Sequence, residues 1–245
     1  NLIPRVQLFD ITNPLAVVAR GFFPASLPSD VVVQGNFAYV AIPSPVKFSI
    51  FEISNPDLPI ARGTISSGLN NTGGVYVKDG FAYVASINSS VIRVFNVSNP
   101  DLITGVGIST TEINAPYRLA GTGNFLLVTD LSGAGIGVFD ISNPAALQWK
   151  GYNSTNLNGA GIMATVGETV VVPSYSNNRM CIFELDRSRN ITFTSSGFQA
   201  TTSPWISNGV NTYRGNGNVG IGISQPRANL HVEGSTYLFG SVGIN

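Results

Sequence analysis

The sequence is poor in the residues that build most metal and nucleophile sites. It has one cysteine and one histidine in 245 residues, so an internal disulfide cannot form and a centre of several Cys and His ligands is excluded. Charged residues make up only 11% and balance to zero, which argues against nucleic acid or an anionic membrane as a partner. No apolar run approaches the roughly 18 residues of a membrane span. We expect no metal, no cofactor and no membrane insertion.

The single cysteine and histidine lie in strand-like segments. Cys181 occurs in RMCIFELD and is expected to be a buried thiol, while His231 lies between Leu230 and Val232 and is expected to be structural. The abundance of Gly, Asn, Ser, Thr and Val indicates a β-rich, turn-rich chain. The start, NLIPRVQLFD, has no initiator Met and no signal-peptide pattern, so we expect a processed N-terminus or a longer parent chain.

A repeat of about 44 residues dominates the first four fifths of the chain. Its copies are FDITNP (9–14), FEISNP (51–56), FNVSNP (95–100), FDISNP (139–144) and the divergent FELDRS (183–188). Each is preceded by a pattern such as VYVKDGFAYVAS (75–86), which predicts a hairpin over Asp79-Gly80. The segment that ends in Phe predicts a third strand, and the segment after the Asn-Pro turn predicts a fourth. Each unit therefore has four short strands, which is the size of a propeller blade.

These motifs resemble the LVIVD-type repeat family, and the resemblance, over roughly residues 4 to 195, implies a β-propeller. We therefore predict an all-β propeller head of four full repeats and a partial first one over residues 1–196. The chain opens in the third strand of a blade, which predicts that the native chain extends further N-terminally.

Two sets of repeated residues invite a functional interpretation. The acidic series Asp10, Glu52, Asn96, Asp140 and Glu184 could form a ring of carboxylates. Asparagine at position 96 would weaken a ring of negative charges, but its side chain can still accept a hydrogen bond as a turn cap. We therefore expect these residues to cap the turns that follow them. Phe37, Tyr39, Phe81 and Tyr83 alternate along hairpin strands and are expected in the core instead of a sugar-stacking platform.

The repeat stops near residue 196, and a different pattern follows. Trp205 to Tyr213 predicts a hairpin over Asn208-Gly209, and Val-Gly-Ile-Gly-Ile (219–223) predicts a strand with one bare face. GSVGIN (240–245) repeats GNVGIG (217–222) after 23 residues.

This segment resembles the stalk element of phage and large-virus tail fibres and some bacterial surface proteins. The resemblance implies a β-rich, homotrimeric stalk over residues 197–245. The residues expected at the trimer interface are Trp205, Tyr213, Val219, Gly220, Ile221, Gly222, Ile223, Leu230 and Val232.

The two resemblances together predict a non-enzymatic attachment fibre on a virion or cell surface, whose propeller head binds a host glycan or protein. Alternatives are a structural spacer in a surface filament and a propeller glycosidase. The glycosidase is disfavoured because Asp-box, Gly-x-Ser-x-Gly and P-loop motifs are absent and the arginines are scattered. GAGIGVFD (133–140) resembles a nucleotide loop, but a strand follows it instead of a helix.

Five Asn-x-Ser/Thr sequons would carry glycans if the protein is made in a eukaryotic host. They are Asn70, Asn88, Asn96, Asn153 and Asn190, and the first two and Asn153 fall in predicted loops.

Overall fold

The computed structural model describes residues 4–109, 112–132 and 135–185, together with five short strands between residues 196 and 232. The chain divides into two units, residues 1–199 and 200–245, which are described separately. Where the structure describes the chain, it contains no helix long and apolar enough to cross a membrane.

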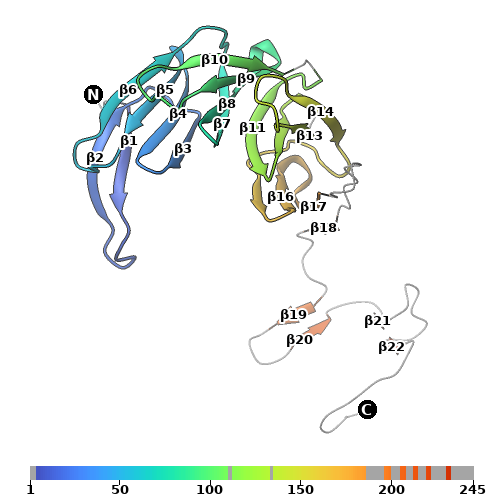
Figure 1. The fold of residues 1–245 in the computed structure, drawn as a ribbon. Helices are drawn as coiled ribbons and strands as arrows, with labels where there is room; N and C mark the ends of the chain where they lie inside the picture. Colours follow the sequence, from blue (N-terminus) through green and yellow to red (C-terminus); the bar gives the residue numbers. More distant parts are fainter. Residues whose placement is uncertain are drawn as a thin grey trace. The chain divides into compact units, whose positions relative to one another are not determined.

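The first unit contains one two-stranded and four four-stranded antiparallel sheets, which we call blades one to five in chain order (Figure 1). Their strands are β1 (Arg5–Asp10) and β2 (Val18–Pro24); β3 (Asp30–Gln34), β4 (Phe37–Pro43), β5 (Val46–Glu52) and β6 (Ile60–Ile65); β7 (Thr72–Lys78), β8 (Phe81–Ser86), β9 (Val91–Asn96) and β10 (Thr104–Ile108); β11 (Pro116–Thr122), β12 (Phe125–Asp130), β13 (Gly135–Asp140) and β14 (Gln148–Asn153); β15 (Ala164–Val166), β16 (Thr169–Ser174), β17 (Arg179–Glu184) and β18 (Ser196–Gln199). Two single 3-10 turns are η1 (Ile87–Ser89) and η2 (Tyr175–Asn177). The predicted four-strand unit is confirmed.

Each blade is built by turn chemistry that the sequence makes visible. Asp79 and Gly80 have φ of 50° and 78°, the left-handed conformation that closes the tight hairpin between β7 and β8. A register shift then recurs between the third and fourth strands, as between Ser49 and Phe51 in blade two. β18 completes blade five and continues past the head boundary predicted at residue 196.

The core lies between successive blades. Tyr39 and Phe48 of blade two pack with Phe95 of blade three, and the rings of Phe48 and Phe95 stack with centroids 5.8 Å apart. Tyr39 and Tyr83 are buried, as expected. Phe37 and Phe81 are half-buried and pack against the same cores. The four aromatic residues are therefore core residues, as predicted.

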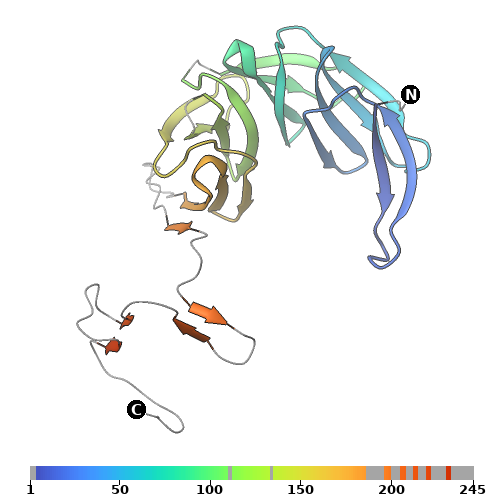
Figure 2. The ribbon, with the colours of Figure 1, turned by 180° about the vertical axis from the view of Figure 1, so that it is seen from behind.

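The first strand of each full blade lies innermost. β3 contacts β7, β7 contacts β11, and β11 contacts β15, while the fourth strands lie outside; Figure 2 shows the same order from behind. This arrangement is propeller-like. Gly73 and Gly74 permit the close approach of β7 and β11, because a Cβ on Gly73 would lie 2.4 Å from the Tyr117 carbonyl oxygen.

The second unit contains two short strand pairs. β19 (Trp205–Ser207) pairs antiparallel with β20 (Thr212–Arg214), which matches the hairpin expected there. β21 (Val219–Ile221) pairs in parallel with β22 (Leu230–Val232). Gly222 and Ile223 lie outside the described residues, and the trimeric stalk stays a prediction.

Candidate functional site

The once-per-blade acidic series caps turns in blades one to four. The turn that follows Glu184 lies outside the described residues. Asp140 accepts hydrogen bonds from the backbone N–H (2.9 Å) and the hydroxyl (2.6 Å) of Ser142. Asn96 accepts the backbone N–H of Ser98 at 2.9 Å in the same way. The predicted capping role is confirmed for both residue types, because an amide oxygen accepts this hydrogen bond as a carboxylate does.

A cation two strand positions away completes the caps of Asp10, Glu52 and Asp140. Asp10 lies 3.7 Å from Arg20, Asp140 lies 3.4 Å from Lys150, and Glu52 pairs with Arg62. Each cation follows its acid by ten residues, and the neutral Asn96 has Val106 at that position.

These contacts lower the pKa of all three carboxyl groups. Hydrogen bonds from Thr12 lower that of Asp10, and those from Ser54 and Arg62 lower that of Glu52. Burial alone would raise the pKa of Asp140, but Ser142 and Lys150 together outweigh it.

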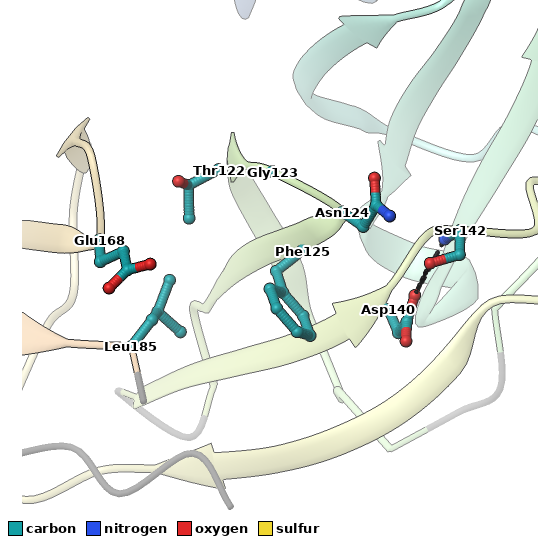
Figure 3. Close-up of a pocket in the computed structure, with 8 residues that line it drawn as sticks. All are labelled: Thr122, Gly123, Asn124, Phe125, Asp140, Ser142, Glu168 and Leu185. Carbon is teal, nitrogen blue, oxygen red and sulfur yellow. Dashed lines mark hydrogen bonds between the residues drawn. The ribbon is translucent and has the colours of Figure 1, made fainter. Parts of the chain in front are cut away.

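A pocket of about 480 Å³ opens between the hairpin turns of blades four and five, and we call it the rim pocket (Figure 3). Its lining residues are Thr122, Gly123, Asn124, Phe125, Asp140, Ser142, Glu168 and Leu185. Most of its polar groups belong to the repeated turn structure. The carbonyls of Asn124 and Glu168 accept the N–H groups of Ile141 and Leu185, and Asn36 holds Ile53 identically in blade two. The rim pocket is therefore part of the scaffold.

A second cavity, of about 390 Å³, lies where the inner strands begin, and we call it the axial cavity. Its lining residues are Pro28, Ser29, Asp30, Val31, Val32, Val75, Arg118, Leu119, Ile162 and Met163. They come from blades two, three and four and from the segment leading into β15. Apolar walls with a few converging polar groups are typical of small-molecule sites.

Arg118 is the main polar group of the axial cavity. Its guanidinium donates to the carbonyl oxygen of Ser29 (2.5 Å), which belongs to the segment that leads into blade two. It also lies 4.3 Å from the ring centroid of Tyr117 and donates to that hydroxyl at 3.2 Å. The Nε of Arg118 is buried and has no hydrogen-bond partner. The Nε atoms of Arg20 and Arg179 are buried without a partner in the same way, so the feature that distinguishes Arg118 is its place in the cavity lining.

Asp30 provides the opposite charge in the same cavity. One carboxylate oxygen accepts the Val31 N–H (3.0 Å) and the other accepts the Val75 N–H (2.9 Å) of the next blade. Because a carboxylate has about four acceptor positions, Asp30 can still accept from a ligand hydroxyl or water.

Sequence reasoning missed both residues, although a signal was present. Aligned by the 44-residue period, Asp30, Gly74, Arg118 and Ile162 occupy one position, just before the apolar part of each inner strand. Because Gly74 and Ile162 are uncharged, the scaffold does not require a charge at this position. The opposite charges of Asp30 and Arg118 there therefore indicate a candidate site.

The remaining predicted candidates are placed as follows. Cys181 is buried, and burial raises the pKa of its thiol; the thiol lies 3.4 Å from the carbonyl oxygen of Asn156. Asn70 is exposed in a loop and Asn88 is exposed within η1, whereas Asn153 ends β14 and Asn96 ends β9. Asn190 lies outside the described residues. In the described part of the chain, no three His, Cys, Asp or Glu side chains are grouped to hold a metal ion.

Comparison with known proteins identifies the repeat. The family model described as LVIVD repeat matches residues 28–66, 71–111 and 118–155. The chain contains LVIVD repeats. These matches cover blades two, three and four, so the part of the predicted resemblance that concerns the repeats is confirmed. A search of curated protein sequences finds no significant match.

Solved structures resemble the fold of this chain at low sequence identity. A protein from Lactobacillus plantarum gives a TM-score of 0.64 at 13% identity over 76% of this chain and 60% of its own. The periplasmic gluconolactonase of Pseudomonas aeruginosa gives 0.64 at 12% over 80% and 63%, respectively. A protein from Bacteroides uniformis, provisionally assigned as a 6-phosphogluconolactonase, gives 0.65 at 14% over 80% and 64%. The chain thus spans 60 to 64% of these structures, and the likeness shows the fold.

The prediction that the protein is not an enzyme is contradicted by solved structures that share its fold. It relied on missing motifs of glycosidases, serine hydrolases and NTPases, and the fold neighbours include lactonases, a class that those motifs do not describe.

Proposed function

We propose that the LVIVD blades bind a small, oxygen-rich, sugar-derived ligand in the axial cavity, of the class of aldonates and aldonolactones. The observation that carries this proposal is the Arg118 guanidinium, which lines a cavity of about 390 Å³ together with Asp30. A guanidinium is well suited to a carboxylate or carbonyl oxygen. Asp30 would accept hydroxyl donors, and the gluconolactonase among the fold neighbours supports this ligand class.

Calorimetric titration with D-gluconate tests the proposal. We expect one binding site per chain and a roughly tenfold or greater loss of affinity in Arg118→Gln, since a hydrogen bond to a charged group contributes about 1.5–3 kcal/mol. Arg93→Gln is the matched control, because Arg93 also donates to a carbonyl oxygen (Gly68, 2.9 Å) but does not line the axial cavity. Equal affinities in both variants would refute the proposal.

Lactone hydrolysis is the second candidate, favoured by Asp30 facing the same cavity as Arg118. Asp30 would accept a proton from the attacking water while Arg118 stabilises the negative charge that develops on the carbonyl oxygen. The ring C–O bond then breaks and its oxygen takes the proton. Acid release from D-glucono-1,5-lactone should exceed the spontaneous rate. It should fall to that rate in Asp30→Asn, which keeps an acceptor for the Val75 N–H.

We also propose that this head is presented on a surface attachment fibre. The support is the two-unit division and the short strand pairs of the second unit. Pairs of three-residue strands are too small to be stable alone, which favours association through this segment. Purified protein should then block attachment of its parent particle or cell to the host, and no block at saturating concentration would contradict the role.

A further inference from the structure

Another cavity, of about 350 Å³, lies between the outer strands of blades two and three, and we call it the outer groove. Its lining includes Ile65 and Ser67 of blade two and Arg93, Phe95, Gly105 and Ile108 of blade three. The blade-three residues come from β9 and β10, the third and fourth strands. The outer groove shares no lining residue with the axial cavity, so it is a separate candidate site.

Gly105 opens the groove, although neither its backbone nor its packing requires a glycine. It does not have the positive φ that favours glycine, and a Cβ there would meet no atom within 4 Å. Gly107, two residues further on, is different, because its Cβ would lie 2.4 Å from the carbonyl oxygen of Pro144. The scaffold therefore explains Gly107 but does not explain Gly105.

The equivalent position in other blades carries a side chain. It is an alanine in blades one and two, and in blade four it is Trp149, opposite Phe139. The indole of Trp149 packs edge-on against Phe139, with ring centroids 5.0 Å apart. In blade three Phe95 has Gly105 opposite it. The repeat thus shows that an aromatic ring fits beside this phenylalanine, and blade three does not supply that ring.

Arg93 places one positive charge in the outer groove. The equivalent residues of the other blades are uncharged, namely Gln7, Ser49, Gly137 and Cys181. The Nε of Arg93 donates to the carbonyl oxygen of Gly68 at 2.9 Å, which holds the guanidinium and leaves its two terminal NH₂ groups for other acceptors.

The charge of Arg93 has no partner of opposite sign in the described part of the chain, where the ion pairs involve other residues. The acid and cation that pair in blades two and four are replaced by the neutral Asn96 and Val106 in blade three. A guanidinium binds a carboxylate through two parallel hydrogen bonds, so an anionic group is the matching partner.

We propose that the outer groove binds a small aromatic carboxylic acid. Its ring lies over Gly105 beside Phe95, as Trp149 lies beside Phe139 in blade four, and its carboxylate pairs with Arg93. Ile65 and Ile108 contribute apolar surface to the ring, and Ile108 is 46% exposed in the empty groove. A site with apolar walls and one fixed polar group is typical of small-molecule recognition.

Indole-3-acetate is the probe, because it combines the ring of tryptophan with one carboxylate. In a ligand-detected NMR titration of the full chain, we expect saturable binding with a Kd of about 1 mM or tighter, as for a ligand of this size. Indole-3-acetamide keeps the ring but has no charge, and it should bind roughly tenfold more weakly. Absence of saturable binding, or equal binding of acid and amide, would refute the proposal.

Variants of the full chain locate the site. Arg93→Gln should weaken indole-3-acetate binding roughly tenfold or more. Gly105→Trp copies blade four and should abolish binding, because its ring would fill the groove. Gly105→Ala, the matched control, removes the glycine without filling the groove and should bind like the parent protein. If Gly105→Trp does not unfold cooperatively, the comparison of acid with amide still decides the question.

The outer groove is tested separately from the axial cavity. Arg118→Gln should bind indole-3-acetate like the parent protein, and D-gluconate should not displace the probe. Loss of binding in Arg118→Gln, or unchanged binding in a folded Gly105→Trp, would place the ligand elsewhere and overturn the proposal.

Discussion

At the scale of single residues, Asp140 and Asp30 are both carboxylates at strand ends, but they relate differently to the repeat. The position of Asp140 holds an acid or an asparagine in every blade, and Asp140 caps a turn through Ser142 and pairs with Lys150. Asp30 has Gly74 and Arg118 at the equivalent positions and faces the axial cavity. Its repetition in every blade indicates a structural role for Asp140, and the break in repetition at Asp30 is the reason that we propose it as part of a binding site.

Substitutions at Asp140 separate the contribution of its turn cap to the free energy of unfolding from that of its ion pair with Lys150. Asp140→Ala removes the acceptor of the Ser142 N–H and should lower the free energy of unfolding by about 1–2 kcal/mol. Asp140→Asn keeps an acceptor, as Asn96 does naturally, and should lose only about 0.5 kcal/mol from the Lys150 pair. Urea unfolding checks both values, and equal losses would show that the cap contributes nothing.

The capping carboxylates also predict how stability depends on pH. The pKa values of Asp10, Glu52 and Asp140 are lowered in the folded state. Their stabilisation is therefore complete above the unfolded-state pKa values and is lost as pH falls from about 5 to 3. The triple variant Asp10→Asn, Glu52→Gln, Asp140→Asn should lose less stability over this range in thermal unfolding. If the stability of the triple variant fell with pH as steeply as that of the parent protein, the role given to these three carboxylates would be contradicted.

At the scale of elements, the approach of β7 and β11 sets the shape of the axial cavity. The pair Gly73-Gly74 lets β11 come close enough for Arg118 to reach the Ser29 carbonyl two blades away. The backbone of Tyr117 and Leu119 occupies the space that a side chain at Gly73 or Gly74 would need.

Gly73→Ala should therefore destabilise the protein by about 1–3 kcal/mol, the usual cost of overpacking. It should also weaken gluconate binding, because β11 carries Arg118. Gly105→Ala on β10 is the matched control, since nothing lies within 4 Å of its added Cβ. Thermal unfolding and calorimetry measure the two effects, and a tolerated Gly73→Ala would contradict this packing.

At the scale of the whole molecule, the fold of the repeats followed from the sequence, while the candidate site did not. Phe spacing, the Asp79-Gly80 hairpin and the Asn-Pro turns are local signals, so the four-strand unit could be predicted. The Arg118–Ser29 contact joins residues 89 apart and depends on how three blades converge. Single-strand patterns do not contain that information.

Oligomerisation is the prediction that belongs to this scale. The full chain should be a trimer through residues from about 203 onward, and a truncated chain ending at residue 199 should be a monomer. Light scattering on both gives the masses directly. A trimeric truncated chain would move the association into the LVIVD blades and contradict the stalk.

The most direct test of the account is a crystal structure of the protein soaked with D-gluconate. We predict that gluconate occupies the axial cavity, with its carboxylate on the Arg118 guanidinium and hydroxyl groups towards Asp30. Gluconate bound in the rim pocket, or bound elsewhere without contact to Arg118, would contradict the central claim.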